Sequence, residues 1–233
     1  MIPKKRFWSD VTVVPARNGF SVALDGRAVK TPAGVALNVP TRALADWVAD
    51  EWSRIDAEID PSVMPATRLA NTAFDAISKK ADDVVLTLSH YANTDLLSYW
   101  ASGPAELVKA QEEHWAPCLS SASSKFGVEI KRTSGVMPVS QDPELQPRVA
   151  TRLKGMSAFE LAGFHDIVTL SGSMFLGLSW YDGEMDEDAV WAASRLDADW
   201  QISQWGEDEE EAIRTAQKRA EFMTAAKFCK LAV

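Results

Sequence analysis

The chain has 233 residues, of which 46% are hydrophobic and 24% charged, the ordinary balance of a folded globular protein with a core. Its formal net charge is -9. The phosphate backbone of a nucleic acid would repel such a surface, and the short basic start Lys4-Lys5-Arg6 is too small to act as a basic patch. The negative charge argues against nucleic acid as a binding partner and favours a protein partner with a basic or neutral surface.

The cysteines and the apolar stretches narrow the class of protein further. Cys118 and Cys229 stand far apart, without the spacing of a metal site, so we expect reduced thiols. The first residues lack the apolar stretch of a signal peptide. The longest apolar stretch, residues 159–180, is interrupted by charged residues and a histidine, which predicts a buried helix and no membrane span.

The first forty residues have the pattern of β-structure. Phe20, Val22 and Leu24 alternate with the smaller residues Ser21 and Ala23, and the following dipeptide Asp25-Gly26 supplies a two-residue hairpin turn. Residues 35–39 alternate again before a proline, and residues 10–14 predict a further strand that ends at Pro15. Together these segments predict a small antiparallel sheet.

A helix is predicted directly after the sheet. Thr41 is a capping residue, and Leu44, Val48 and Trp52 then recur at every fourth position. A small sheet must bury its apolar side, so this helix is expected to cover one face of it. Pro61 and Pro65 mark the end of this β-rich N-terminal domain, which we place at residues 1–65.

Almost everything beyond residue 65 has helical periodicity. The candidate helices are 66–78, 81–100, 104–119, 143–157, 159–179, 186–204 and 207–229, separated by Gly103-Pro104, the serine cluster 120–124, Gly155, Asp182-Gly183 and Gly206. We therefore predict an α+β fold: an N-terminal small antiparallel β-sheet domain with a covering helix, followed by an all-α helical domain over residues 66–233.

Motifs that would indicate a cofactor or a metal are absent from the sequence. There is no phosphate-binding loop, and Ser171-Gly172-Ser173 lacks the spacing of a nucleophile elbow. Its place within the predicted helix 159–179 favours close helix packing. None of the three histidines, His90, His114 and His165, has another histidine or cysteine three or four residues away. We expect no cofactor, no metal and no catalytic residues.

One enzymatic alternative stays open. His90, Asp95 and Tyr99 lie within a few turns of the predicted helix 81–100, so they could converge on a polar site. An enzyme would show a deep pocket around these residues and a group with a perturbed pKa, whereas a binding protein would show an exposed apolar surface.

The predicted helix 186–204 carries an acid on an apolar face. Val190, Ala193, Asp197 and Trp200 fall at positions i, i+3, i+7 and i+10. An acid in such surroundings needs a partner, either within the fold or on another protein. On the same helix, Arg195 is expected to pair with the acid one turn later, Asp199.

The last predicted helix opens with an acidic run. Glu207 to Glu211 follow Gly206, where carboxylates interact favourably with the exposed N–H groups of a helix N-terminus. The run could also form an acidic docking surface.

Some of the nine tryptophans are expected in the core and others as anchors of an interface.

Several short motifs follow one another in a fixed order along most of the chain. They are Arg6-Phe7-Trp8, Leu24-Asp25-Gly26-Arg27, Lys30-Thr31-Pro32, Glu51-Trp52, Met64-Pro65-x-Thr67-Arg68-Leu69, Tyr91-x-x-Thr94-Asp95-Leu96-Leu97-x-Tyr99, Gln111-x-x-x-Trp115-x-Pro117, Phe126-Gly127, Trp191-x-x-Ser194-Arg195-Leu196-Asp197-x-Asp199-Trp200-Gln201 and Trp205-Gly206-Glu207-Asp208. In this order the chain resembles the family of chaperones that assemble the catalytic head of the F-type ATP synthase by binding its alpha subunit.

The resemblance implies a fold, a partner and a site. It implies an N-terminal α+β domain and a C-terminal helical domain. It also implies that the protein binds the free alpha subunit without catalysing a reaction, and that it covers the apolar surface of this subunit until the beta subunit replaces the chaperone. Bacterial members of the family are cytoplasmic, and organelle members lie in the mitochondrial matrix. The resemblance implies no small-molecule substrate. The resemblance maps the family's acidic position onto Asp197, and we expect Trp200, Arg195, Trp205 and Glu207 to bind the partner together with it. Family members often carry Glu at the position of Asp197. A general protein-binding scaffold is the remaining alternative.

Overall fold

The computed structural model describes residues 5–135 and 138–233, so Lys4 of the basic start lies outside the described residues. The chain forms two compact units. The first contains the chain up to Ala81 together with Met156–Phe164 and Thr224–Val233, and the second contains Asp82–Gly155 and His165–Met223. Each unit therefore combines separate stretches of sequence. The division into domains 1–65 and 66–233 stays a prediction.

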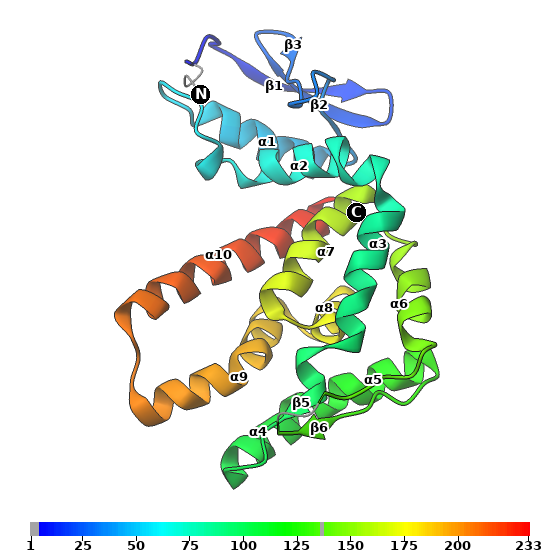
Figure 1. The fold of residues 1–233 in the computed structure, drawn as a ribbon. Helices are drawn as coiled ribbons and strands as arrows, with labels where there is room; N and C mark the ends of the chain where they lie inside the picture. Colours follow the sequence, from blue (N-terminus) through cyan, green and yellow to red (C-terminus); the bar gives the residue numbers. More distant parts are fainter. Residues whose placement is uncertain (1–4, 136–137) are drawn as a thin grey trace. The chain divides into compact units, whose positions relative to one another are not determined.

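The first unit contains the predicted antiparallel sheet (Figure 1). Its strands are β1 (Val11–Ala16), β2 (Gly19–Leu24), β3 (Arg27–Ala28) and β4 (Asn38–Val39), with β2 pairing with the other three. Asp25 and Gly26 both have positive φ, as the predicted two-residue turn requires. The expectation that Pro15 ends the first strand is wrong: β1 continues to Ala16, because an edge strand tolerates a residue without an N–H donor.

Helix α1 (Arg42–Ser53) covers the sheet as predicted. It begins after Thr41, whose Oγ1 accepts a hydrogen bond from the N–H of Leu44 at 3.1 Å. Leu44 and Val48 are fully buried, and α1 contacts β1 and β2. A short 3₁₀ turn, Pro61–Val63, then leads into helix α2 (Pro65–Asp75).

A buried carboxylate joins α1 to α2. Glu51 accepts hydrogen bonds from the N–H groups of Ala66 at 2.6 Å and Thr67 at 2.8 Å, and from the Thr67 hydroxyl at 2.7 Å. Burial raises the pKa of Glu51, and these hydrogen bonds oppose the increase only in part. Glu51 and Thr67, which belong to two different motifs of the sequence, thus contact each other.

Helices α7 (Ala158–Ser171) and α10 (Glu209–Leu231) meet within the first unit at a glycine. A Cβ atom on Gly163 would lie 2.7 Å from the carbonyl oxygen of Ala225 and 2.8 Å from Sγ of Cys229. The two helix backbones therefore approach too closely for any larger residue at this position.

We expect Gly163→Ala to lower the free energy of unfolding by about 2 kcal/mol, because the added methyl group must push the two helices apart. Urea unfolding followed by circular dichroism measures the change. The matched control is Gly155→Ala, whose added Cβ would meet its nearest neighbour, the Arg152 carbonyl oxygen, at 3.4 Å. Equal stability of the two variants would contradict the tight contact.

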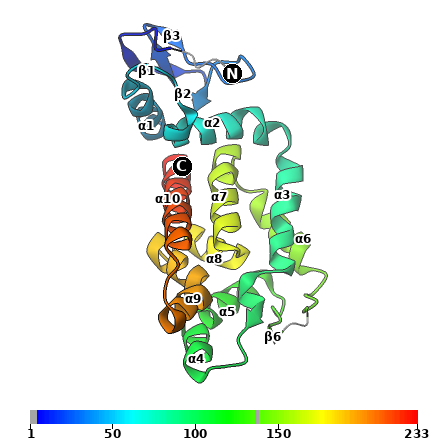
Figure 2. The same cartoon turned by 60° about the vertical axis from the view of Figure 1, so that its left-hand side comes forward.

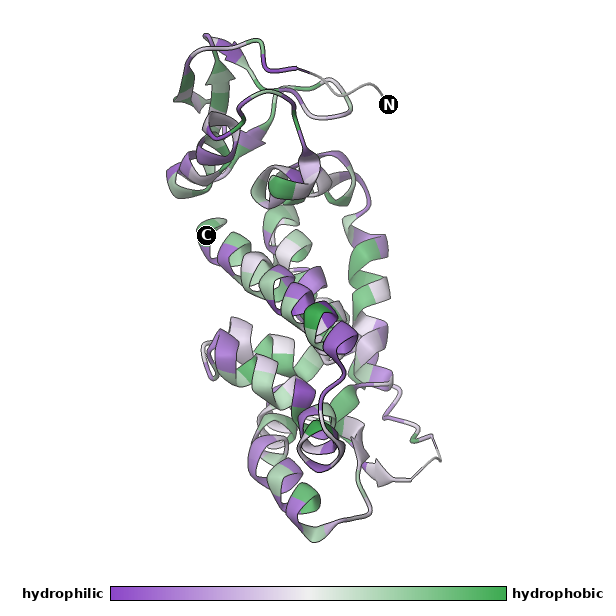
Figure 3. Ribbon diagram, turned by 90° about the vertical axis from the view of Figure 1, so that its left-hand side faces the viewer, coloured by the Kyte–Doolittle hydropathy of each residue, from purple (hydrophilic) through white to green (hydrophobic). Residues whose placement is uncertain are grey.

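The second unit is mainly helical. It contains most of α3 (Ala81–Ser89), then α4 (Ala105–His114), α5 (Ala116–Phe126), α6 (Leu145–Leu153), α8 (Met174–Tyr181) and α9 (Glu187–Trp205). Hydrophilic and hydrophobic residues are mixed along many helices of the chain (Figure 3), whereas α8 is buried over almost its whole length. The two short strands of this unit, β5 (Tyr99–Trp100) and β6 (Thr133–Ser134), pair in parallel, which the purely helical expectation missed. The predicted α+β fold class is confirmed.

Three predicted helix limits are wrong. The helix predicted over 81–100 ends at Ser89 and is followed by 3₁₀ turns at His90–Asn93 and Leu96–Ser98. The helix predicted over 104–119 breaks at Trp115, between α4 and α5. The serine cluster 120–124, expected to separate helices, lies within α5. Two of its hydroxyls have partners outside the helix: Ser121 donates to Glu184 at 2.8 Å, and Ser123 accepts from the N–H of Ile130 at 3.2 Å. These bonds limit their competition for the helix backbone.

The predicted helix 159–179 is also divided in two. Gly172 has a φ of +70° and ends α7, and Ser173 caps α8 by accepting a hydrogen bond from the N–H of Leu176 at 3.0 Å. The Ser171-Gly172-Ser173 motif is therefore a junction between helices, and its placement in mid-helix was incorrect.

Candidate functional site

Helix α9 carries most of the residues expected to bind a partner. It begins after Asp186, whose side chain accepts a hydrogen bond from the N–H of Ala189 at 2.8 Å, and Glu187 and Asp188 occupy its first turn. It ends at Gly206, which has a φ of 88°. The inner side of the helix is apolar and buried, with Val190, Trp191 and Ala193.

Asp197 has a partner within the fold. Its Oδ1 accepts a hydrogen bond from Nε2 of Gln111 at 2.7 Å, and the fully buried Gln111 in turn accepts one from the N–H of Ala101 at 2.9 Å. Burial raises the pKa of Asp197, and the bond from Gln111 opposes the increase. The acid on the apolar face is thus satisfied on one side by an amide, and it remains half-exposed on the other.

Trp115 adds a second connection to α9. Its Nε1 donates to the carbonyl oxygen of Ala193 at 2.9 Å, deep in the core of the second unit. Gln111 and Trp115 are four residues apart, and together they hold the middle of α9 in place. Sequence reasoning missed this role of Gln111. The available signal was its spacing from Trp115, which puts both residues on one side of a helix.

Arg195 and Asp199 form the predicted ion pair. Nε of Arg195 lies 3.1 Å from Oδ1 of Asp199, one turn later on α9. The Arg195 side chain is only 16% exposed, whereas that of Asp199 is 57% exposed. Arg195 is therefore placed at the border between the core and the solvent-facing part of α9.

Two tryptophans contact each other at the outer end of α9. The rings of Trp200 and Trp205 meet edge to face, with centroids 5.9 Å apart. Trp205 is 76% exposed, and Ile213 on α10 is also exposed. Large apolar side chains that remain in solvent are typical of a surface that another protein covers.

Acidic residues follow this exposed end in the chain, and two of them, Glu210 and Glu211, are paired with Arg214 at 2.9 and 3.1 Å. Glu207 follows Gly206 and is exposed, and Glu209 to Glu211 form the first turn of α10. Asp208 caps that helix by accepting a hydrogen bond from the N–H of Glu211 at 2.9 Å. In Figures 1 and 2 the loop between α9 and α10 stands at the edge of the second unit, away from α5 and α6. We call Trp200, Trp205, Glu207, Glu209–Glu211 and Ile213 the acidic aromatic surface.

The three residues of the enzymatic alternative do not share a helix. His90 is exposed, with Nε2 at 3.3 Å from Nε2 of Gln146, and the backbone of Tyr99 belongs to β5. Asp95 is fully buried. The expectation that they converge rested on a continuous helix 81–100, which the structure does not contain.

The buried carboxylate of Asp95 has structural partners on two segments. Its Oδ1 accepts hydrogen bonds from the N–H of Leu97 at 3.0 Å and from Oγ of Ser173 at 2.7 Å, and Oδ2 accepts one from the N–H of Phe175 at 3.2 Å. Burial raises the pKa of Asp95 to about 7, against the lowering effect of these hydrogen bonds. Asp95 therefore connects the 3₁₀ turn Leu96–Ser98 to the start of α8.

Within residues 5–135 and 138–233, no group of three or more histidine, cysteine, aspartate or glutamate side chains could hold a metal ion. Across the same part of the chain, no helix combines the length and the apolar character needed to cross a bilayer.

The fold and sequence match known proteins along nearly the whole chain. The family model of the ATP12 chaperone protein matches residues 5–123. A crystal structure of Atp12 from Paracoccus denitrificans is 38% identical with a TM-score of 0.93, and an aspartate-to-lysine mutant of the same protein is 37% identical with a TM-score of 0.93. Each comparison covers 98% of this chain and 98% of the other.

Two further proteins extend the comparison. Atu1473 from Agrobacterium tumefaciens is 37% identical, with a TM-score of 0.90 over 97% of this chain and 85% of that one. The mitochondrial protein atp12 of Schizosaccharomyces pombe is 26% identical over 215 residues, which are 87% of this chain and 74% of the yeast protein.

The matching family model, together with the α+β fold shared over 98% of the Paracoccus structures, defines the chain as an assembly chaperone. It belongs to the ATP12 chaperone family, whose members act in ATP synthase assembly. The family resemblance seen in the sequence motifs is thereby confirmed.

Proposed function

We propose that the protein binds the unassembled alpha subunit of the F-type ATP synthase and shields the apolar surface that the beta subunit later covers. The observation that carries the proposal is the exposed Trp205, which meets Trp200 edge to face within the acidic aromatic surface. We place this activity in a bacterial cytoplasm, and the protein would act by binding alone, without catalytic turnover.

The chemistry of the surface suits this task. A free subunit exposes an apolar interface that would otherwise associate non-specifically, and tryptophan side chains can cover it with a large apolar area. The acids around Trp205 would select basic groups at the rim of the client and increase the rate of encounter. Moderate affinity would let the beta subunit displace the chaperone.

The proposed contact residues lie along the outer half of α9 and in the loop that follows it. Trp200, Trp205 and Glu207 would contact the client directly, with Asp197 and Arg195 at the inner border of the contact. Gln111 donates its hydrogen bond to Oδ1 of Asp197, so the exposed side of this carboxylate can still meet a basic group of the client.

Co-expression with single subunits tests the proposal. We expect the tagged protein to retain soluble alpha subunit but not beta, to release alpha when beta is added, and to bind less alpha at high salt because the acidic rim is screened. Gel filtration and pull-down measure each step.

The outcomes separate the competing functions. Retention of neither subunit, or of beta alone, would contradict the proposed client. Equal protection of an unrelated aggregating protein such as citrate synthase would indicate a general scaffold.

A further inference from the structure

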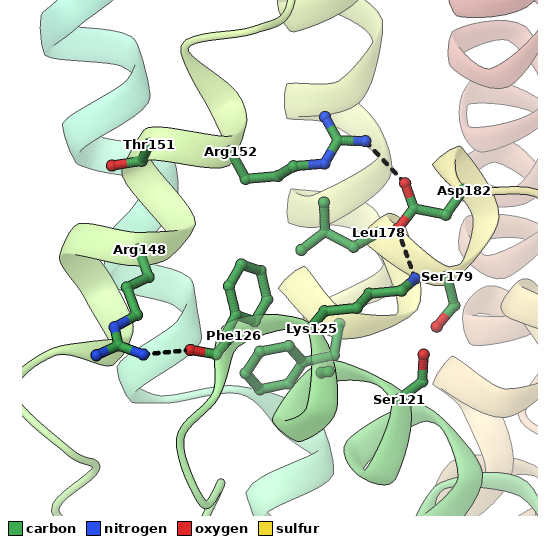
Figure 4. A pocket seen from close by; sticks show the side chains of 11 residues that line it. Ser121, Lys125, Phe126, Arg148, Thr151, Arg152, Leu178, Ser179 and Asp182 are labelled. Carbon is green, nitrogen blue, oxygen red and sulfur yellow. Dashed lines mark hydrogen bonds and ion pairs between the residues drawn. The ribbon is translucent and has the colours of Figure 1, made fainter.

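A pocket of about 510 Å³ lies in the second unit, between α5, α6 and α8 (Figure 4). Its floor is apolar, with the buried side chains of Phe126, Phe175 and Leu178. Its rim carries three cationic side chains, Lys125, Arg148 and Arg152, and a single carboxylate, Asp182. Two further carboxylates lie beside this rim: Glu184 is 2.8 Å from Nζ of Lys125, and Glu144 is 3.9 Å from a terminal nitrogen of Arg148. The Glu144 contact is long and exposed, so Arg148 is the least neutralised of the three cations.

The carboxylate of Asp182 holds two of the cations in place. Its Oδ2 lies 2.6 Å from Nζ of Lys125, and its Oδ1 lies 2.8 Å from a terminal nitrogen of Arg152. Burial by itself raises the pKa of Asp182, but the hydrogen bonds from Lys125 and Arg152 outweigh it and hold the pKa below its ordinary value. Asp182 therefore stays ionised at neutral pH, and both cations keep a fixed position.

Arg148 is held by the end of a helix. One of its terminal nitrogens donates to the carbonyl oxygen of Phe126 at 2.7 Å, where α5 ends and a positive charge is favoured. Arg148 and Arg152 are four residues apart and lie on the same side of α6. A guanidinium has five N–H donors in a planar fork that matches a carboxylate, so donors remain available for a ligand.

The rim and the floor together select the ligand. Arg148, the least neutralised cation, and Arg152, which shares Asp182 with Lys125, favour an anionic group through their remaining N–H donors, and the apolar floor favours an apolar group beside it. Inorganic phosphate would satisfy the rim alone. We infer that the pocket binds a polypeptide segment in which an apolar side chain stands next to a carboxylate.

The pocket would give the chaperone a second contact with its client, of opposite charge to the acidic aromatic surface. The identity of the client rests on the proposed function, whereas the chemistry of the segment rests on the pocket itself. A client held at two sites of opposite charge would be oriented as well as shielded.

Calorimetric titration of the full chain with short peptides tests the inference. We expect Ac-Phe-Glu-Leu-Asp-NH₂ to bind at least about tenfold more tightly than Ac-Phe-Gln-Leu-Asn-NH₂, because charge-assisted hydrogen bonds are the stronger kind. Equal binding of the two peptides, or no binding of either at millimolar concentration, overturns it. Displacement of the acidic peptide by inorganic phosphate at equal concentration also overturns it, since the pocket would then be a simple anion site.

Two variants tie the binding to the pocket. Arg148→Gln should weaken the binding of the acidic peptide about tenfold. Thr151→Glu should do the same by adding a negative charge at an exposed position of the rim, without removing the bonds of Arg148. Lys109→Gln is the matched control, because it removes an exposed cation of α4 outside the pocket. Unchanged peptide affinity in both rim variants contradicts the inference.

The two proposals can fail separately. If the wild-type protein binds the acidic peptide but does not retain the alpha subunit, the proposed client is wrong and the pocket stands. If it retains the alpha subunit equally with and without Arg148→Gln, and the peptide does not bind, the pocket inference is wrong and the proposed function stands. Melting curves of the variants confirm that each is folded.

Discussion

Between about pH 5 and pH 8, the protein is expected to lose about 3 kcal/mol of unfolding free energy relative to its Asp95→Asn variant. The cause is the fully buried Asp95, whose pKa burial raises from 3.8 to about 7. The folded state therefore keeps a proton that the unfolded chain releases. This contribution to stability is complete below the unfolded pKa, declines as the pH rises, and is gone above the folded pKa.

Urea unfolding at several pH values measures this difference. The asparagine variant keeps an oxygen acceptor for Leu97 and Ser173 but cannot titrate, so only the slope of the difference against pH reports Asp95. Glu51 and Asp197 also have raised pKa values, and they contribute equally to both proteins. A difference that does not change with pH would show that Asp95 is ionised in the folded protein throughout this range.

Asp197→Lys is expected to abolish retention of the alpha subunit. The variant reverses the charge at the border of the proposed contact, where a basic group of the client would meet the carboxylate. It also removes the acceptor of Gln111 Nε2, which should lower the free energy of unfolding by about 1 to 2 kcal/mol. Pull-down of the alpha subunit measures the first effect, and thermal unfolding measures the second.

Asp197→Asn separates these two effects. It preserves an oxygen for Gln111 and removes only the charge, so we expect a folded protein with reduced retention of the alpha subunit. If Asp197→Lys loses helical circular dichroism or melts at a much lower temperature, Asp197 is a structural residue and the loss of binding carries no information about the contact.

Trp205→Ala tests the same contact without affecting the core, since this side chain is 76% exposed. We expect about 30-fold weaker binding of the alpha subunit with unchanged stability, the effect of removing an interface anchor. Leu86→Ala is the matched control, because Leu86 is a 53% exposed apolar residue on α3. Equal affinity of the two variants would remove the outer end of α9 from the proposed interface.

The structure gives several family motifs a physical explanation. Glu51 and Thr67 join α1 to α2, Asp95 joins a 3₁₀ turn to α8, and Gln111 reaches Asp197 on α9. In each case a buried polar side chain connects two segments that are distant in sequence. An unsatisfied buried polar group is costly, so each side chain depends on its partner. These motif residues therefore define the fold. Of the proposed client contacts, Trp205 and Glu207 are exposed, whereas Asp197 serves both the fold and the proposed contact.

The sequence by itself determined the features that depend on near neighbours. The Asp25-Gly26 turn, the cap at Thr41 and the Arg195–Asp199 pair all follow from spacings of a few residues, which the backbone geometry of turns and helices imposes. The candidate binding residues on α9 came from the same helical period and from the family resemblance.

Only the tertiary structure decided which polar groups meet across the chain. Ser173 lies 78 residues from Asp95, and Asp197 lies 86 residues from Gln111, so no local pattern could pair them. The division of the predicted helix 159–179 belongs to the same contact, because the Ser173 hydroxyl caps α8 and also donates to Asp95. The pocket between α5, α6 and α8 likewise exists only once three helices pack together. Local spacing determines secondary structure, but the burial of a charged or polar group depends on the whole fold around it.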